Sequence, residues 1–415
     1  MTLAVAKGFS YLHIKRKILF VFLKNKNIKL MKFINISALV LVLLLVKLRG
    51  GDFKREEAIK LGIEQIYSLN FEGAEDTFKA LKEKNAQDPA PAFFLAMIEW
   101  EKIQLNIEDE SRDEIFFKKI DEAIKACDEQ LKQNPKDYEA LFFKGGAIGF
   151  KGRLLALREK WIDAAALGKD ALPIVNEVYK LKPENIDILL GFGIYNYYAE
   201  AIPEQYPFTK PLLFFIPKGN KKLGINQLKK AAEEGKYANY EAAYFLIHIL
   251  YDAENNFEEA EKYSLWLNKK FPNNPIFRRQ LGRIYYKWGY FEKAFDIFKS
   301  IYEQSEAGDF GFSQRFKRDA SYYLGVIYLN YKNNLDSALF YLSKCEELSL
   351  KIEQNKSKKS GFYVKSLYYQ GEIYERMGFN QTAIKIYKDV VELNDYDNTR
   401  DRAKNKLKLL EAKKN

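Results

Sequence analysis

Apolar residues recur every three or four positions through most of the chain after residue 52, and this spacing marks one face of an α-helix. The helical stretches come in pairs. In the first pair Ala58 and Leu61 share a face of one stretch, Ala74 and Phe78 share a face of the next, and Pro89 closes the unit. Proline ends such a unit because it cannot continue a helix. The pattern therefore predicts an all-α chain built from helical hairpins.

Three later pairs repeat one motif, in which a glycine precedes a tyrosine by three residues and the second stretch carries an alanine and a large apolar residue. The copies are Leu281-Gly282-x-x-Tyr285 with Ala294 and Phe298, Leu324-Gly325-x-x-Tyr328 with Ala338 and Leu342, and Gln370-Gly371-x-x-Tyr374 with Ala383 and Tyr387. Ala260 and Ala294, in neighbouring hairpins, are 34 residues apart. This series resembles the tetratricopeptide repeat (TPR), whose signature runs in the same order over about 34 residues.

The resemblance covers residues 53–412 and implies a right-handed superhelical solenoid of about seven to eight TPR-like hairpins. We interpret residues 398–414, a basic amphipathic helix, as the polar cap that the end of a solenoid needs. In the third hairpin we expect a longer linker through Gly149 and Gly152. Residues 140–250 also resemble the eukaryotic inclusion-body-clearance branch of TPR proteins, from which we transfer no function.

Residues 195–220 form an irregular insertion in the fourth hairpin. Four prolines lie within fifteen residues, and prolines at this density preclude a regular helix: Pro203, Pro207, Pro211 and Pro217. Two interpretations stay open. The segment folds back onto neighbouring hairpins, or it exposes an apolar tip to a partner or a lipid surface. The candidate residues of that tip are Tyr206, Leu212, Phe214 and Phe215.

The formal net charge of +11 comes almost wholly from the N-terminal part of the chain. Ten of the 67 Lys and Arg residues, and none of the 56 Asp and Glu residues, lie in residues 1–50. The remaining chain therefore carries 57 basic against 56 acidic residues. A nearly neutral repeat region has no bulk attraction for a nucleic-acid backbone, so we predict no nucleic-acid partner.

Residues 31–51 are typical of a signal peptide or membrane anchor. Lys32 precedes an apolar run from Phe33 to Val46, which is shorter than the about 20 residues of a spanning helix. Lys47 and Arg49 follow where a cleavage site would lie. We interpret residues 1–30 as a basic upstream extension before a natural start at Met31; the alternative is a longer basic anchor on a membrane surface. We expect an exported, envelope-type protein, periplasmic or membrane-anchored.

Candidate chemistry is sparse. The chain has two histidines, His13 and His248, and two cysteines, Cys127 and Cys345. We expect His248 to be a packed, hydrogen-bonded core residue and both cysteines to be unpaired core residues. No cluster of histidines, cysteines and carboxylates has the spacing of a metal site, and no nucleophile has a histidine base. The sequence predicts no enzyme, no cofactor and no metal.

In the TPR family the concave groove is lined by the first helix of each hairpin. Counting from the glycine motifs gives the candidate partner-binding residues Arg279, Arg283, Tyr286, Lys287, Tyr322, Asn330, Tyr368, Glu372 and Arg376. A lining that contains Tyr and Arg is typical of binding hot spots. The resemblance implies a non-catalytic protein–protein interaction scaffold. Two alternatives stay open: a membrane-surface protein that contacts lipid through the N-terminal anchor and residues 195–217, and an accessory subunit of an enzyme.

Overall fold

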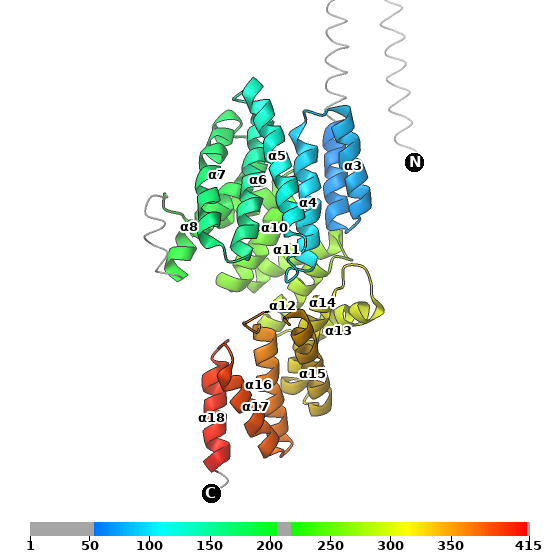
Figure 1. The fold of residues 1–415 in the computed structure, drawn as a ribbon, viewed down its shortest axis with the longest axis vertical. Helices are drawn as coiled ribbons and strands as arrows, with labels where there is room; N and C mark the ends of the chain where they lie inside the picture. Colours follow the sequence, from blue (N-terminus) through cyan, green and yellow to red (C-terminus); the bar gives the residue numbers. More distant parts are fainter. Residues whose placement is uncertain (1–53, 206–216, 355, 413–415) are drawn as a thin grey trace, which may run out of the picture. The chain divides into compact units, whose positions relative to one another are not determined.

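The computed structural model describes residues 54–205, 217–354 and 356–412. The chain divides into two compact units, Met1–Glu57 and Ala58–Asn415. All regular structure in the described residues is helical (Figure 1). The predicted signal or anchor at 31–51 and the four residues of the insertion tip lie outside the described residues, so they stay predictions.

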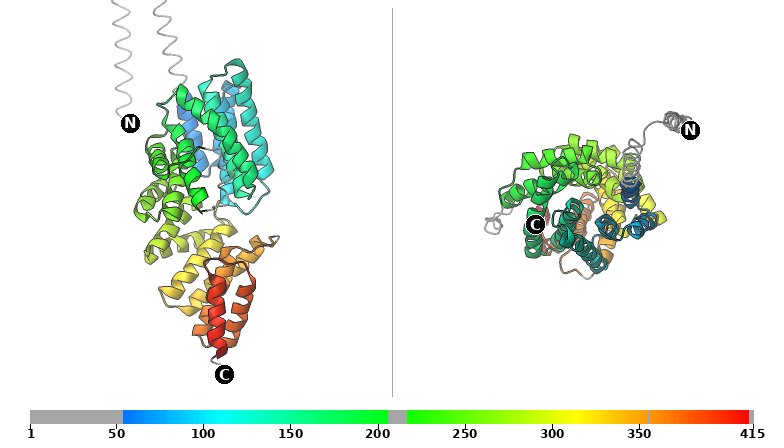
Figure 2. Two further views of the ribbon diagram at one scale, coloured as in Figure 1. Left: turned by 90° about the vertical axis from the view of Figure 1, so that its left-hand side faces the viewer. Right: turned by 90° about the horizontal axis from the view of Figure 1, so that it is seen from above.

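In the described residues, helical hairpins follow one another in chain order (Figure 2). The order of the described helices gives eight of them. The first helices of the hairpins are residues 54–67, α4 (Pro89–Leu105), α6 (Tyr138–Leu157), α8 (Leu189–Gln205), α10 (Asn239–His248), α12 (Pro275–Trp288), α14 (Gln314–Asn330) and α16 (Gly361–Arg376). The second helices are α3 (Phe71–Lys84), α5 (Asp113–Gln133), α7 (Trp161–Leu181), α9 (Lys221–Glu234), α11 (Phe257–Lys270), α13 (Phe291–Ala307), α15 (Leu335–Ile352) and α17 (Asn380–Glu392). The prediction of an all-helical solenoid with about seven to eight hairpins is confirmed.

Three further elements complete the described chain. A 3-10 turn, η1 (Ile186–Ile188), precedes α8, and a π-helix, η3 (Ile249–Ala253), continues α10 without a break. The C-terminal helix α18 (Thr399–Ala412) packs on α17, and Ala403 and Leu410 join the apolar cluster that α16 and α17 form.

Asparagine and aspartate side chains fix where many of the helices begin. Each accepts a hydrogen bond from a backbone N–H in the first turn, as N-caps do: Asn70, Asp88, Asp137, Asn220, Asn256, Asn274 and Asn334. Pro89 follows its cap as the first residue of α4, where a missing N–H costs no helical bond. Pro89 therefore starts the second hairpin, and the expectation that it closes the first was wrong.

The motif glycines set the distance between the two helices of a hairpin. A Cβ atom built on Gly325 would lie 2.6 Å from Leu342, and one built on Gly371 would lie 2.7 Å from the ring of Tyr387. Both partners are fully buried. No side chain fits at these glycines, so the large apolar residue of the second helix packs directly on the backbone of the first. In each of the three motif copies, the glycine thus lies against the large apolar residue of the same copy.

Two local expectations were wrong. Gly149 and Gly152 lie inside α6, because the flanking residues favour a helix and Gly152 packs against α7, where a Cβ would meet Leu167 at 3.5 Å. Pro203 lies inside α8, so residues 195–205 are helical. A proline this close to the C-terminal end of a helix removes one backbone hydrogen bond and leaves the earlier turns intact.

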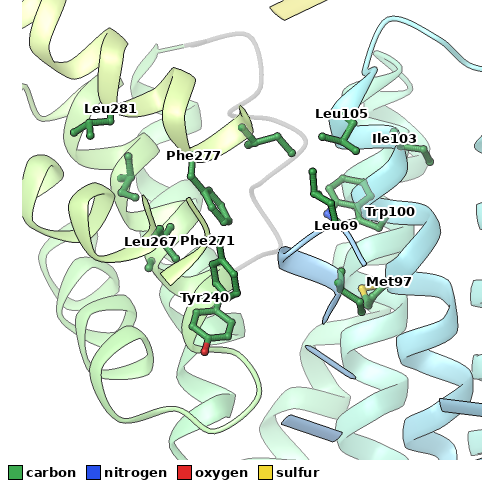
Figure 3. Packing of buried hydrophobic residues seen from close by; sticks show 14 of the residues in the cluster. Leu69, Met97, Trp100, Ile103, Leu105, Tyr240, Leu267, Phe271, Phe277 and Leu281 are labelled. Carbon is green, nitrogen blue, oxygen red and sulfur yellow. The ribbon is translucent and has the colours of Figure 1, made fainter. Parts of the chain in front are cut away.

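The hairpins also return to the beginning of the larger unit. The ring centroid of Tyr67 lies 5.4 Å from that of Tyr240, 5.6 Å from that of Phe271 and 5.9 Å from that of Phe277. Figure 3 shows buried side chains from both sides of this contact, with Trp100 of α4 on one side and Tyr240 of α10 and Phe277 of α12 on the other. We call it the closure seam: the contact of residues 64–108 with residues 240–318.

Candidate functional site

A group of polar and aromatic side chains gathers where the first helices of hairpins three to six face one another. We call these six residues the inner cluster: Arg153 of α6, Tyr198 of α8, Tyr244 and His248 of α10, Asp252 of η3 and Arg283 of α12. Their charges act on one another. Burial raises the pKa of Tyr198 and of Tyr244, and the positive charge of Arg153 opposes that rise at both. Five elements thus contribute to one electrostatic neighbourhood.

The π-helix η3 orients the carboxylate of the inner cluster. π-turns inside helices are rare and occur often at functional sites, because the extra residue per turn changes the direction of the following side chains. Asp252 Oδ2 lies 3.2 Å from His248 Nδ1, and Arg283 Nη2 donates a 3.3 Å hydrogen bond to Asp252 Oδ1. Although burial opposes it, the hydrogen bond with His248 and the charge of Arg283 lower the pKa of Asp252. Asp252 is therefore ionised at neutral pH.

Two cations of α12 lie on one tyrosine ring. The Arg283 guanidinium is 4.7 Å and the Lys287 ammonium 4.8 Å from the ring centroid of Tyr251, within the range of cation–π attraction. Lys287 Nζ also donates a 3.1 Å hydrogen bond to the Tyr251 carbonyl. Lys287 is exposed, and the Arg283 side chain keeps 19% of its surface accessible. Asp252 balances one of these two positive charges, so the site keeps a positive excess.

Arg153 holds α6 against α10. Its guanidinium lies 4.3 Å from the ring of Phe245 and 4.6 Å from that of Trp100, and it forms an ion pair with Glu241. Glu241 also accepts a 2.9 Å hydrogen bond from the Tyr67 hydroxyl. The side chain of Arg153 is 22% accessible, so it both connects the two helices and forms part of the surface of the inner cluster.

The structure brings the α12 candidates together at this site. Arg283 and Lys287 reach Tyr251 as described, and Tyr286 is half-buried with its ring centroid 5.0 Å from that of Tyr323. Arg279 is half-buried and forms an ion pair with Asp319 of α14. These contacts show where the side chains lie. That they bind a partner stays a prediction.

The α14 and α16 candidates do not form one surface. Tyr322 and Tyr368 are buried, and the Arg402 guanidinium of α18 lies 4.3 Å from the Tyr368 ring. Glu372 lies 3.9 Å from Lys406 of α18. The exposed candidates of these helices are Asn330 and Arg376, and Arg376 Nη1 donates to the Leu329 carbonyl at 3.4 Å. Helix α18 thus contacts the α16 side chains that the sequence assigned to a groove.

The histidine expectation is confirmed in part, and the cysteine expectation is confirmed. His248 is hydrogen-bonded to Asp252 and its ring centroid lies 4.6 Å from that of Tyr244, but it is not a fully buried core residue, because 28% of its side chain is accessible. Burial lowers its pKa, which the nearby Asp252 partly offsets. Cys127 and Cys345 are free and buried, and burial raises the pKa of each thiol to about 12.

Sequence reasoning missed the α10–η3 part of the site. Its count of groove positions began at the glycine motifs, and hairpin five has no glycine in its first helix. A signal was present, because His248 and Asp252 are four residues apart and therefore share a helix face. No residue pattern in the sequence predicts the π-helix that orients Asp252.

In the part of the chain that the structure describes, no group of three or more His, Cys, Asp and Glu side chains could hold a metal ion. Within the same residues, no helix has the length and apolar character of a membrane span.

The hairpins, their glycine contacts and their succession decide the class of repeat. The protein is a TPR-like helical solenoid. No protein-family model matches the chain, and no curated protein matches it. Its description as TPR-like rests on its own residues and packing.

Several solved helical-repeat structures are similar to the chain at low identity. Human IFIT1, in a dimer with PPP-AAAA, is 13% identical over 78% of this chain and 68% of that one, with a TM-score of 0.35. PilW, a widely conserved type IV pilus biogenesis factor, is 16% identical over 63% and 98%, with a TM-score of 0.39. Yeast Tom70 is 11% identical over 84% and 87%, with a TM-score of 0.36.

Proposed function

We propose that this protein is a non-catalytic scaffold that binds a segment of a partner protein on the inner face formed by α10, η3 and α12. One observation carries the proposal: Arg283 and Lys287 both lie on the Tyr251 ring, both remain accessible, and Asp252 compensates only one of them. The site therefore favours an acidic group of the partner that is flanked by apolar surface.

The chemistry of the site favours an acidic segment. A carboxylate of the partner gains charge-assisted hydrogen bonds from a guanidinium and an ammonium, which are stronger than bonds between neutral groups. The half-buried Tyr286 beside them supplies apolar contact area. Arg and Tyr are enriched among the residues that dominate binding energy in protein interfaces. Arg283 and Lys287 are therefore the expected anchors, and Tyr286 supports them.

A peptide library tests this proposal. We expect fluorescence-labelled acidic peptides of about 12 residues to bind the purified chain, and basic peptides of the same length not to bind. Arg283→Ala with Lys287→Ala should weaken acidic-peptide binding by roughly 30-fold or more, since a hot-spot truncation costs about 2 kcal/mol.

The matched control removes two lysines from the second helix of the same hairpin. Lys293 and Lys299 of α13 have side chains that are 56% and 54% accessible, so Lys293→Ala with Lys299→Ala removes equal charge away from the inner face. This control should bind as the wild type does. Equal weakening by both double variants, or preference for basic peptides, would reject the site.

We further propose that the protein works in the cell envelope, held there or exported through residues 31–51. The basic residue and apolar run of that segment support the proposal. Fractionation of cells that express the full chain or a chain starting at Asp52 tests it. Recovery of the full chain with membranes, and of the shorter chain in the soluble fraction, is expected. Equal solubility of both contradicts it.

A second candidate is binding to a lipid surface, and one observation favours it. Ile202 of α8 and Leu223 of α9, on either side of residues 206–216, are both exposed. Exposed apolar side chains of this size gain free energy by entering a lipid interface. Flotation with liposomes separates the candidates: binding lost on Ile202→Ser with Leu223→Ser, with peptide binding intact, would favour the lipid surface.

A further inference from the structure

The closure seam joins the first two hairpins to α12 and α14 through polar groups around an apolar centre. At one end Asn274 Nδ2 donates to the Tyr67 carbonyl and to Glu101 Oε1, each at 3.0 Å. At the other end Arg315 Nη1 donates a 2.8 Å hydrogen bond to the Gln104 carbonyl. These partners are more than 170 residues apart in sequence, so their contacts exist only while the seam is closed.

The two ends of the seam differ in their balance of charge. At the Arg315 end, Arg318 Nη2 donates a 2.7 Å hydrogen bond to Glu108 Oε1, and Glu353 and Asp319 also contact the Arg318 guanidinium. Arginine stays protonated over the whole physiological range. Each carboxylate at this end therefore has a permanent cation beside it, and pH changes near neutrality leave the contacts intact.

At the other end, two carboxyl groups share one cation. Glu101 of α4 is 5% exposed, and its side-chain hydrogen-bond donor is the neutral amide of Asn274. The charged or titratable groups that face it are Glu241 of α10, Arg153 of α6 and Tyr67 of the helix over residues 54–67. Glu241 is already engaged with Arg153 and with the Tyr67 hydroxyl. Glu101 is thus a buried carboxyl without a cation of its own.

We propose that the closure seam is a proton-dependent latch, in which Glu101 must be protonated for α4 to close fully against α12. When Glu101 ionises, a buried negative charge lies beside Glu241 with only an amide to solvate it, and such burial is costly. Opening of the seam transfers the carboxylate to water. The Arg315 end stays paired, so the seam opens from the Glu101 end.

The direction of the pH effect follows from proton linkage. Burial and, to a smaller extent, the nearby Glu241 raise the pKa of Glu101 to about 8, although the hydrogen bond from Asn274 and the charge of Arg153 oppose the shift. In the open seam the carboxyl titrates near its ordinary value of 4.5. The closed form binds the proton more tightly, so closure is strongest below this value. It weakens as pH rises toward 8 and then levels off.

Thiol labelling of the seam measures its opening. Leu69 is buried in the apolar centre, where a Cβ on Gly311 would come within 2.7 Å of it, so Leu69→Cys reports exposure of the seam. Lys82→Cys, at an exposed position of α3, gives the intrinsic labelling rate at each pH. The ratio of the two rates is the opening equilibrium. It should rise by up to tenfold per pH unit between pH 6 and 8 and level off above.

Substitutions at Glu101 decide whether that residue is the sensor. Glu101→Gln keeps an acceptor for Asn274 without a titrating group, so its labelling ratio should be independent of pH. Glu101→Asp keeps the titrating group and should retain the rise. Glu99→Gln is the matched control, because Glu99 is also a buried carboxyl of α4 but contacts Lys102, Arg112 and Lys119. It should show the wild-type pH profile.

These measurements use the full chain without any binding partner. A wild-type ratio that does not change between pH 6 and 9 overturns the proposal. A Glu101→Gln variant that keeps the wild-type profile, or a Glu99→Gln variant that loses it, overturns the assignment to Glu101.

Discussion

Helices α7 and α13 occupy equivalent places as second helices of their hairpins, yet they pack very differently. In α13, Ala294, Phe298 and Ile301 are fully buried. In α7, all of whose residues are described, Val178 is the buried residue, and Trp161 and Ile162 are 64% and 78% exposed. The difference is not one of composition, because α7 is the more apolar of the two helices.

The contrast shows that the order of small and large residues, more than the apolar content of a helix, decides whether a hairpin packs closely on the next one. In α13 a large ring meets a small residue: Phe298 faces Gly282 of the first helix and stacks on Tyr323 of the next hairpin at 4.3 Å between ring centroids. Helix α7 has apolar residues without this alternation. Its contact with the next hairpin is a small cluster around Val178 and Ile188.

The largest expected effect tests the stacked side of the comparison. Phe298→Ala removes a ring that is wholly buried between two hairpins, so we expect the free energy of unfolding to fall by about 3–5 kcal/mol. Urea denaturation followed by circular dichroism measures it. A loss below about 1 kcal/mol would mean that the stack around α13 tolerates a cavity, and the comparison with α7 would fail.

A pair of glycine substitutions sharpens the comparison. Gly325→Val places side-chain atoms into Leu342, so it should cost about 1–3 kcal/mol of stability. Gly168 lies in α7 with no neighbouring atom within 4 Å of a built Cβ, so Gly168→Ala should stabilise by about 0.5–1 kcal/mol. Thermal unfolding of both variants gives the signs. A loss of stability at Gly168→Ala would indicate that α7 is covered.

The smallest expected effect is on the exposed side. Trp161→Ala with Ile162→Ala removes two large apolar side chains, but exposed substitutions usually change stability by no more than about 0.5 kcal/mol. The melting temperature should stay within about 2 °C of the wild type, as expected for a change this small. A larger drop would show that these residues pack against something, which would remove the difference between α7 and α13.

The proposed binding site could be predicted from the sequence only in part. The count from Gly282 placed Arg283, Tyr286 and Lys287 on one helix face, where the structure has them. It could not find Tyr251 and Asp252, because hairpin five lacks the glycine and its first helix ends in a π-turn that changes the facing of both residues. It also assigned Tyr368 to a groove, although Arg402 of α18 lies over its ring.

The sequence by itself determined the local and repeating part of this protein. Three features act within one hairpin or between neighbouring hairpins: helical periodicity, asparagine and aspartate caps, and the contact of a glycine with a large apolar residue. They can therefore be predicted from residues less than about 40 positions apart. The closure seam and the inner cluster were decided only by the tertiary structure. Arg153 meets Glu241, and Asn274 meets Glu101, because small rotations between successive hairpins accumulate until distant hairpins touch. No pattern among residues close together in the sequence predicts these accumulated rotations.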